Sequence, residues 1–199
     1  LLRLNQLKTL LRVKKNSLNF SKNIEITLEG NPSDLNKGYL TSAKKMGINR
    51  LSLGLQTFKE EILKKSLHSS HNSKFGVKLI KNALEIGFDT VNVDLLYGIP
   101  GQKQADWQFD IEKILKIAPQ SITIYRYVIH KDSASAKMIQ RGLLQQQANE
   151  KEIHELYLWA CKKLGDAGYY EKRFGCFAKL DEIKTRFLCS PLGLLLPLA

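Results

Sequence analysis

A strand-like segment followed by a helix-like segment, repeated four times, is the feature that most narrows the folds open to this 199-residue chain. Short runs rich in β-branched residues alternate with longer runs that carry apolar residues at helical spacing. The predicted strands cover residues 24–28, 50–55, 90–96 and 120–129, and the predicted helices cover residues 1–18, 34–46, 58–65, 75–86, 106–117 and 149–164. This alternation predicts an α/β fold with a parallel sheet. Polar residues near several strand ends favour a partial (β/α) barrel over a doubly wound sheet.

The chain is strongly basic, with 31 Lys and Arg against 19 Asp and Glu and a formal net charge of +12. Such a field attracts anions. The lysines are spread in pairs through helix-like segments, however, and no basic run is interleaved with aromatic residues. We therefore expect solvated helix faces and no nucleic-acid partner.

No segment is predicted to cross a membrane or to direct export. Basic residues interrupt every early apolar run, and the apolar stretch at 191–199 is short and contains Pro191 and Pro197. A cytoplasmic location is the expectation.

The cysteines are few and widely spaced, at positions 161, 176 and 189. An odd number at this spacing fits neither a disulfide framework nor a compact metal site. Cys161 stands among apolar residues at helical spacing, which predicts a core thiol. His68 and His71 lie in a polar segment without cysteine or carboxylate partners, so we expect exposed histidines and assign no metal ligand.

Polar residues stand at or near the carboxyl ends of the four predicted strands: Glu29, Gln56, Asp94 and the Tyr127-Val128 pair. Ligands of parallel α/β folds bind at these ends. Carboxylates placed there suit ribose hydroxyls or an amino group, which they hold by charge-assisted hydrogen bonds. The alternative is that each carboxylate caps the next helix or pairs with a lysine.

Three segments carry a resemblance to a known family: EITLEGNP at 25–32, GINRLSLGLQTF at 47–58 and NVDLLYGIPGQ at 92–102. In this order and spacing they resemble the radical-SAM family of oxygen-independent coproporphyrinogen III oxidase, and more closely its haem-chaperone (HemW) branch. The resemblance covers residues 1–179. It implies barrel residues at 1–130, the start of the family's carboxy-terminal region at 131–179 and a divergent tail at 180–199.

The resemblance implies a partial (β/α) barrel that binds S-adenosylmethionine and a [4Fe–4S] cluster and serves porphyrin or haem metabolism. Glu29, Gln56 and Asp94 match family positions that contact S-adenosylmethionine, and Val128 matches a backbone position near its adenine. No catalytic residue is assigned.

Two departures from the family pattern shape the expectation. The Cys-x-x-x-Cys-x-x-Cys loop that holds the cluster is absent, so we expect a truncated fragment, incomplete at its amino-terminal end and inactive alone. The place of a family arginine falls on His68 or Ser69.

Two other functions remain open. One is a non-catalytic module that binds haem or porphyrin, since the basic surface suits propionates and the histidines at 68, 71, 130 and 154 are potential axial ligands. The other is a degenerate inactive fragment, since an incomplete barrel leaves a strand edge unpaired.

Overall fold

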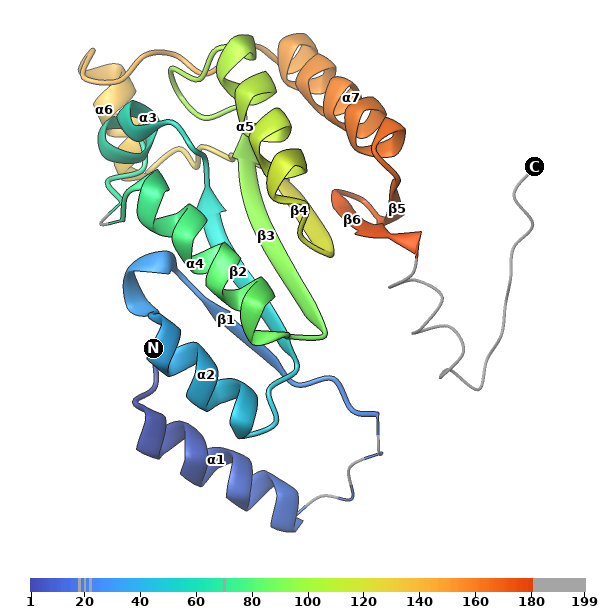
Figure 1. Ribbon diagram of the computed structural model, residues 1–199. Coiled ribbons are helices and arrows are strands. Elements are labelled where there is room, and N and C mark those ends of the chain that lie inside the picture. The colour runs from blue at the N-terminus through green and yellow to red at the C-terminus, as the bar shows by residue number, and fades with distance from the viewer. Residues whose placement is uncertain (18, 20, 22, 70, 181–199) are drawn as a thin grey trace.

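The computed structural model describes residues 1–180 except positions 18, 20, 22 and 70, and these residues form a six-stranded sheet (Figure 1). The strand order is β1-β2-β3-β4-β6-β5; the first four strands are parallel to one another, and β6 is antiparallel to both of its neighbours, β4 and β5. The strands are β1 (Thr27–Gly30), β2 (Arg50–Gln56), β3 (Thr90–Tyr97), β4 (Ser121–Arg126), β5 (Tyr169–Arg173) and β6 (Cys176–Lys179). Within the described residues the sheet does not close on itself, so the prediction of a partial barrel is confirmed.

The helices follow the strands in the predicted alternation. They are α1 (Leu4–Ser17), α2 (Lys37–Lys45), α3 (Glu60–Lys65), α4 (Ser73–Ile86), α5 (Gln104–Ile117), α6 (Ala134–Gln140) and α7 (Glu150–Asp166), with a 3-10 turn, η1 (Pro32–Asp34). Figure 1 shows α2, α4 and α5 on one face of the sheet. No helix in the described part of the chain is both long enough and apolar enough to cross a membrane.

The two faces of the parallel sheet differ in chemistry. Leu53, Val93 and Ile122 lie side by side on β2, β3 and β4, and all three are fully buried in the core. Side chains alternate along a strand, so the intervening residues face the other way. These include Ser52 and Asn92, which are also neighbours in the register. One face of the sheet therefore packs on the core and the other, here called the polar face, carries hydrogen-bonding side chains.

The first strand begins later than predicted. Residues 24–28 were expected, but the ladder starts at Thr27. The reason is Asn49, whose side chain accepts a hydrogen bond from the Ile26 amide at 2.7 Å and donates to the Ile24 carbonyl at 2.9 Å. Glu29 consequently lies within β1 and not after it.

Two helix ends are set by local capping residues. Ser33 lies in η1, ahead of α2, and the Asn36 side chain caps α2 by accepting from the Tyr39 amide. Helix α4 ends at Gly87, which has a left-handed φ of 79°.

Helix α6 and the β5–β6 hairpin were not predicted. The hairpin extends the sheet through β6, which pairs antiparallel with β4. The strand expected to reach residue 129 ends at Arg126. Of the predicted tail, residues 181–199 lie outside the described residues, and so does Cys189.

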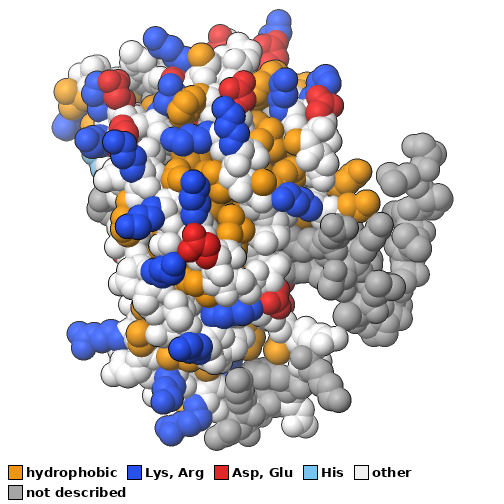
Figure 2. All heavy atoms as spheres, in the orientation of Figure 1, with side chains coloured by type: hydrophobic (Ala, Val, Ile, Leu, Met, Phe, Trp, Pro, Cys, Tyr) orange, Lys and Arg blue, Asp and Glu red, His pale blue; other side chains and the backbone are white. Residues whose placement is uncertain are grey.

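On the face shown in Figure 2, lysine and arginine side chains are spread among acidic and apolar ones and do not gather into one patch. The charge is distributed over the helices, as the sequence indicated.

Candidate functional site

Glu29 and Asp94 lie on the polar face of the sheet, on either side of β2. The register pairs Glu29 with Ser52, and Asp94 with Gly54 two residues further along β2. Glu29 is exposed and Asp94 is partly buried. Burial, and to a smaller extent the negative charge of Glu29, raises the pKa of Asp94.

Asp94 is fixed by hydrogen bonds from its neighbours on the polar face. Asn92 Nδ2 donates to Asp94 Oδ1 at 2.8 Å, and the Ser52 hydroxyl donates to Oδ2 at 3.2 Å. Asn92 in turn accepts from the Thr123 hydroxyl at 3.0 Å. Burial raises the pKa of Asp94 above its ordinary value, while the bonds from Asn92 and Ser52 oppose that rise. The network holds the carboxylate in one orientation.

Tyr125 also borders this face and was not singled out from the sequence. Its side chain is half exposed, and burial together with the charge of Asp94 raises the pKa of its phenol. It carries no motif, so only its position on β4 reveals it.

Gln56 ends β2 in a left-handed conformation, with φ of 73°. The register with β3 shifts at this point, between Gly54 and Gln56. A Cβ on Gly54 would lie 3.0 Å from Gln56 Nε2 and 3.1 Å from Asn31 Oδ1. The glycine therefore leaves room for two carboxamide groups that meet above the end of β2.

The turn after Gln56 is tied to helix α5 by a buried carboxylate, Asp110. Its Oδ2 accepts from the Thr57 hydroxyl at 2.6 Å, and its Oδ1 accepts from the Phe58 amide at 2.8 Å. Asp110 is fully buried, and burial raises its pKa to about 7 even though both hydrogen bonds act to lower it. Sequence reasoning missed this residue.

His71 is buried, so the expectation of an exposed histidine is wrong for this position, whereas His68 is exposed. The Nε2 atom of His71 lies 3.3 Å from the Leu55 carbonyl, and the Nδ1 atom of His71 lies 2.8 Å from the Ser69 hydroxyl. A carbonyl only accepts, so Nε2 carries the proton. Burial lowers the pKa of His71, which favours this neutral form.

A cavity of about 330 Å³ opens at the carboxyl ends of β1, β2 and β3. Gln56 and Asn31 reach it from the strand ends, and His68 and His71 from the segment before α4. Its remaining lining consists of Ser33, Leu67, Ser69 and Leu96. The site where the family arginine was expected is thus the wall of a cavity next to Gln56.

Val128 lies beyond β4 and is 59% exposed. The Tyr127 amide donates to the Tyr97 carbonyl at 2.8 Å, which holds this segment beside the end of β3. Gln147 Nε2 donates to the carbonyls of Tyr127 and Gly98. Gln147 comes from a run of three glutamines without a motif, so nothing in the sequence marked it.

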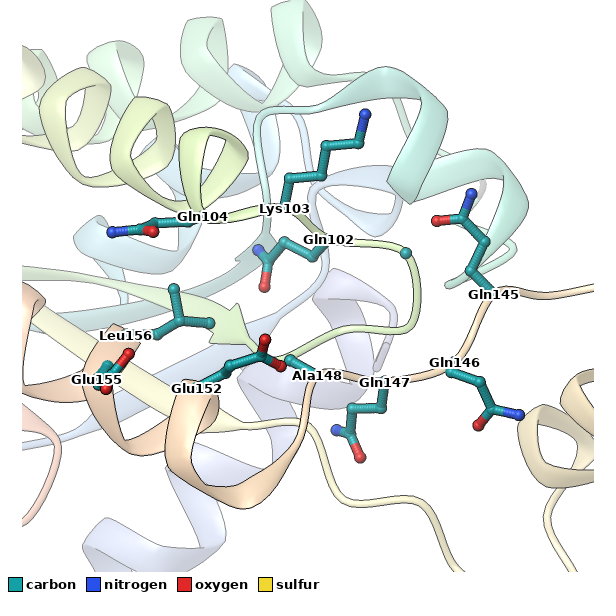
Figure 3. A pocket seen from close by; sticks show the side chains of 11 residues that line it. Gln102, Lys103, Gln104, Gln145, Gln146, Gln147, Ala148, Glu152, Glu155 and Leu156 are labelled. Atoms are coloured by element: carbon teal, nitrogen blue, oxygen red, sulfur yellow. The ribbon is translucent and has the colours of Figure 1, made fainter.

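A second cavity, of about 290 Å³, lies between the start of α5 and the start of α7 (Figure 3). Its walls are polar: Figure 3 shows Gln102, Gln145 and Glu152 around it. None of Glu29, Gln56, Asp94 and Val128 lines it.

Metal-ligating side chains do not converge in the described chain. No three His, Cys, Asp or Glu residues among those described are placed to hold a metal ion. Cys161 packs against the core from α7, and Cys176 lies on β6; both are free thiols. The described residues therefore do not fit a [4Fe–4S] cluster, which cysteine thiolates hold.

Residues 1–114 match the sequence model that defines the radical SAM superfamily. The haem chaperone HemW of Bacillus subtilis is 31% identical over 84% of this chain and 43% of its own length. HemW of Buchnera aphidicola is 32% identical over 91% of this chain and 46% of its own length. The chain thus spans about half the length of these curated relatives.

A solved structure shows the same fold. Coproporphyrinogen III oxidase (HemN) from Escherichia coli, a radical SAM enzyme, matches 93% of this chain and 43% of its own with a TM-score of 0.79 and 23% identity. The resemblance drawn from the three motifs is confirmed, and S-adenosylmethionine and a [4Fe–4S] cluster are the cofactors that this family implies. By its sequence, the chain belongs to the radical SAM superfamily.

Proposed function

We propose that the strand ends of this chain form the S-adenosylmethionine-binding part of a radical SAM protein. The observation that carries the proposal is that Glu29 and Asp94 flank β2 on the polar face, while Gln56 stands at the carboxyl end of β2 in the wall of the 330 Å³ cavity. Val128 completes the set through its backbone, beyond the end of β4.

The chemistry of these groups fits the ligand. S-adenosylmethionine carries positive charge on its sulfonium and amino groups, and its ribose offers two hydroxyl donors. Glu29 and Asp94 place two carboxylate acceptors on one face of an otherwise basic protein. The Gln56 carboxamide both donates and accepts. Val128 is an exposed residue beyond the end of β4, and its backbone groups suit the edge of an adenine.

When bound in such proteins, S-adenosylmethionine supplies radical chemistry. The part of the chain that the structure describes provides no thiolate set for the cluster. The role proposed for these residues is to bind and orient the nucleoside and the amino acid.

We further infer a role in haem or porphyrin metabolism, with the haem-chaperone branch favoured. The support is that two relatives covering most of this chain are named haem chaperones, while the structural match is a coproporphyrinogen III oxidase. Adding haemin to the chain tests direct haem binding. A shifted Soret band that saturates at one equivalent would support it, and an unshifted band would leave the chain with the S-adenosylmethionine role alone.

The S-adenosylmethionine proposal is tested by titration calorimetry of the purified chain. We expect one site, and Asp94→Asn should weaken binding about 10- to 150-fold, because a hydrogen bond to a charged group contributes about 1.5–3 kcal/mol. Glu85→Gln is the matched control: it removes an exposed carboxylate on α4 that pairs with Lys37, away from the strand ends. Equal affinity in wild type and Asp94→Asn, or no binding at all, would refute the proposal.

A further inference from the structure

Gln56 adopts a backbone conformation that glutamine rarely takes by itself. In the described chain three non-glycine residues have positive φ, namely Gln56, His68 and Ala118. The first two border the same cavity beside the proposed ligand site. A left-handed non-glycine residue persists only where its surroundings hold it, and such residues cluster at ligand clamps. The contacts that hold Gln56 therefore bear on binding.

On the carboxy-terminal side of Gln56, the turn is held by Asp110 from α5. The carboxylate takes the Thr57 hydroxyl at 2.6 Å and the Phe58 amide at 2.8 Å, the two donors that directly follow Gln56. Thr57 is itself fixed, since its Oγ1 accepts from the Lys59 amide at 3.1 Å. Each of the three residues after Gln56 thus takes part in this network, Thr57 with two bonds and Phe58 and Lys59 with one each.

On its amino-terminal side, the turn is held by His71. The Leu55 carbonyl accepts from the Thr57 amide at 3.0 Å, and His71 Nε2 lies 3.3 Å from the same oxygen. The residue before Gln56 and the two residues after it are therefore bonded to side chains from two parts of the chain, the segment before α4 and helix α5.

Asp110 stands on a firmly anchored helix. Trp107, one turn earlier on α5, is fully buried and donates its indole N–H to the Leu156 carbonyl of α7 at 3.0 Å. Lys59 and Asp106 form a second tie between the turn and α5, at 2.9 Å. Burying a carboxylate costs free energy, and an apolar residue of similar size would fill the same space without that cost. Packing alone therefore does not account for a carboxylate at position 110.

We propose that Asp110 is a positioning residue that acts through Thr57 and Phe58 to keep the Gln56 carboxamide aimed at S-adenosylmethionine. This inference rests on the proposed function for the role of Gln56, whereas the claim that Asp110 sets the Gln56 conformation stands independently of any ligand. Asp110 itself touches no ligand in this arrangement, because it is enclosed between the turn and α5.

The test combines two readouts on the 199-residue chain. The Cα and Cβ chemical shifts of Gln56, measured by NMR without ligand, report whether φ is positive. Calorimetry with S-adenosylmethionine reports affinity. The variants are Asp110→Asn, which turns one acceptor oxygen into a donor at constant size, and Thr57→Val, which removes the hydroxyl and keeps the carboxylate. The matched control is Tyr169→Phe, which removes a buried 2.6 Å hydrogen bond to the Pro119 carbonyl at a distant place in the fold.

We expect both variants to move the Gln56 shifts away from left-handed values and to weaken binding about five- to tenfold, the loss of one hydrogen bond. Tyr169→Phe should lower the melting temperature without either effect. In the double variant Gln56→Ala/Asp110→Asn the two losses should not add, because Asp110 acts only through Gln56.

Unchanged Gln56 shifts in Asp110→Asn and Thr57→Val would overturn the inference, and so would fully additive losses in the double variant. If the wild-type chain binds no S-adenosylmethionine, the proposed function fails, and the shifts alone decide whether Asp110 sets the turn. The two failures are thereby distinguishable.

Discussion

Asp110 makes the stability of this protein depend on pH in an unusual direction. Its pKa is raised from 3.8 to about 7 in the folded chain, chiefly by burial. Between these values the folded state holds a proton that the unfolded state has released, so the free energy of unfolding falls as pH rises from about 4 to about 7. Three pKa units correspond to a loss on the order of 4 kcal/mol. Urea denaturation across this range measures it.

The control for that slope is Asp110→Asn, which carries no titrating group at this position. Its free energy of unfolding should lack the fall between about pH 4 and about pH 7. The same slope in both proteins would show that Asp110 is not the group responsible.

Ser52 offers a second prediction at the level of single residues. Its hydroxyl donates to Asp94 and thereby holds the pKa of Asp94 down against the effect of burial. If ionised Asp94 binds S-adenosylmethionine, affinity falls as the carboxyl is protonated. Ser52→Ala should move the midpoint of that fall to higher pH, as calorimetry at a series of pH values would show. A midpoint that stays in place or moves to lower pH would contradict the role given to Asp94.

Part of the candidate site could be predicted from the sequence. The residues that were predicted lie in local sequence patterns, whereas those that were missed depend on contacts between distant parts of the chain. Glu29, Gln56 and Asp94 sit in motifs and at or near strand ends, where local pattern locates them. Asp110 was missed because its partner Thr57 lies 53 residues away, and no local pattern records such a pairing. His71 was misjudged for a similar reason, since the carbonyl that its Nε2 contacts belongs to Leu55 of β2, 16 residues away in the sequence.

The periodicity of the sequence predicted the parallel strands and the helices between them. It did not predict where individual strands begin and end. Asn49 replaces two rungs of the β1 ladder with side-chain bonds, which a pattern of β-branched residues cannot reveal. The β5–β6 hairpin was missed because four of the five β5 residues are exposed, so no alternation marks the strand.

The turn of that hairpin gives a prediction for the element. Gly175 has φ of 74°, and a Cβ there would lie 2.5 Å from the Ile124 carbonyl oxygen of β4. Gly175→Ala should destabilise the fold by about 2–4 kcal/mol, because backbone strain and a backbone clash combine. Gly87→Ala is the control: its φ is 79°, but nothing lies within 4 Å, so only the strain of about 1 kcal/mol remains. If Gly175→Ala and Gly87→Ala lower the free energy of unfolding equally, in thermal or urea unfolding, then β4 moves aside without cost and the predicted clash is refuted.

At the scale of the whole molecule, one face of the sheet packs on the core and the other carries the proposed binding residues. The helices bury one face of the sheet, and the opposite face keeps Glu29, Asp94 and their polar neighbours clear of the apolar core. A strand-by-strand alternation of apolar and polar side chains produces both faces at once. The partial barrel could be predicted from this pattern and from the motifs. The antiparallel direction of β6, set by the β5–β6 hairpin, could not be predicted in this way.

The most direct test of the central claim is to map S-adenosylmethionine on the chain by NMR, following backbone amide shifts during a titration. We expect the largest changes at Glu29, Gln56, Asp94 and Val128, with none at the second cavity around Gln102 and Gln145. Changes centred on that second cavity, or no change at the four strand-end residues, would contradict the assignment of this site.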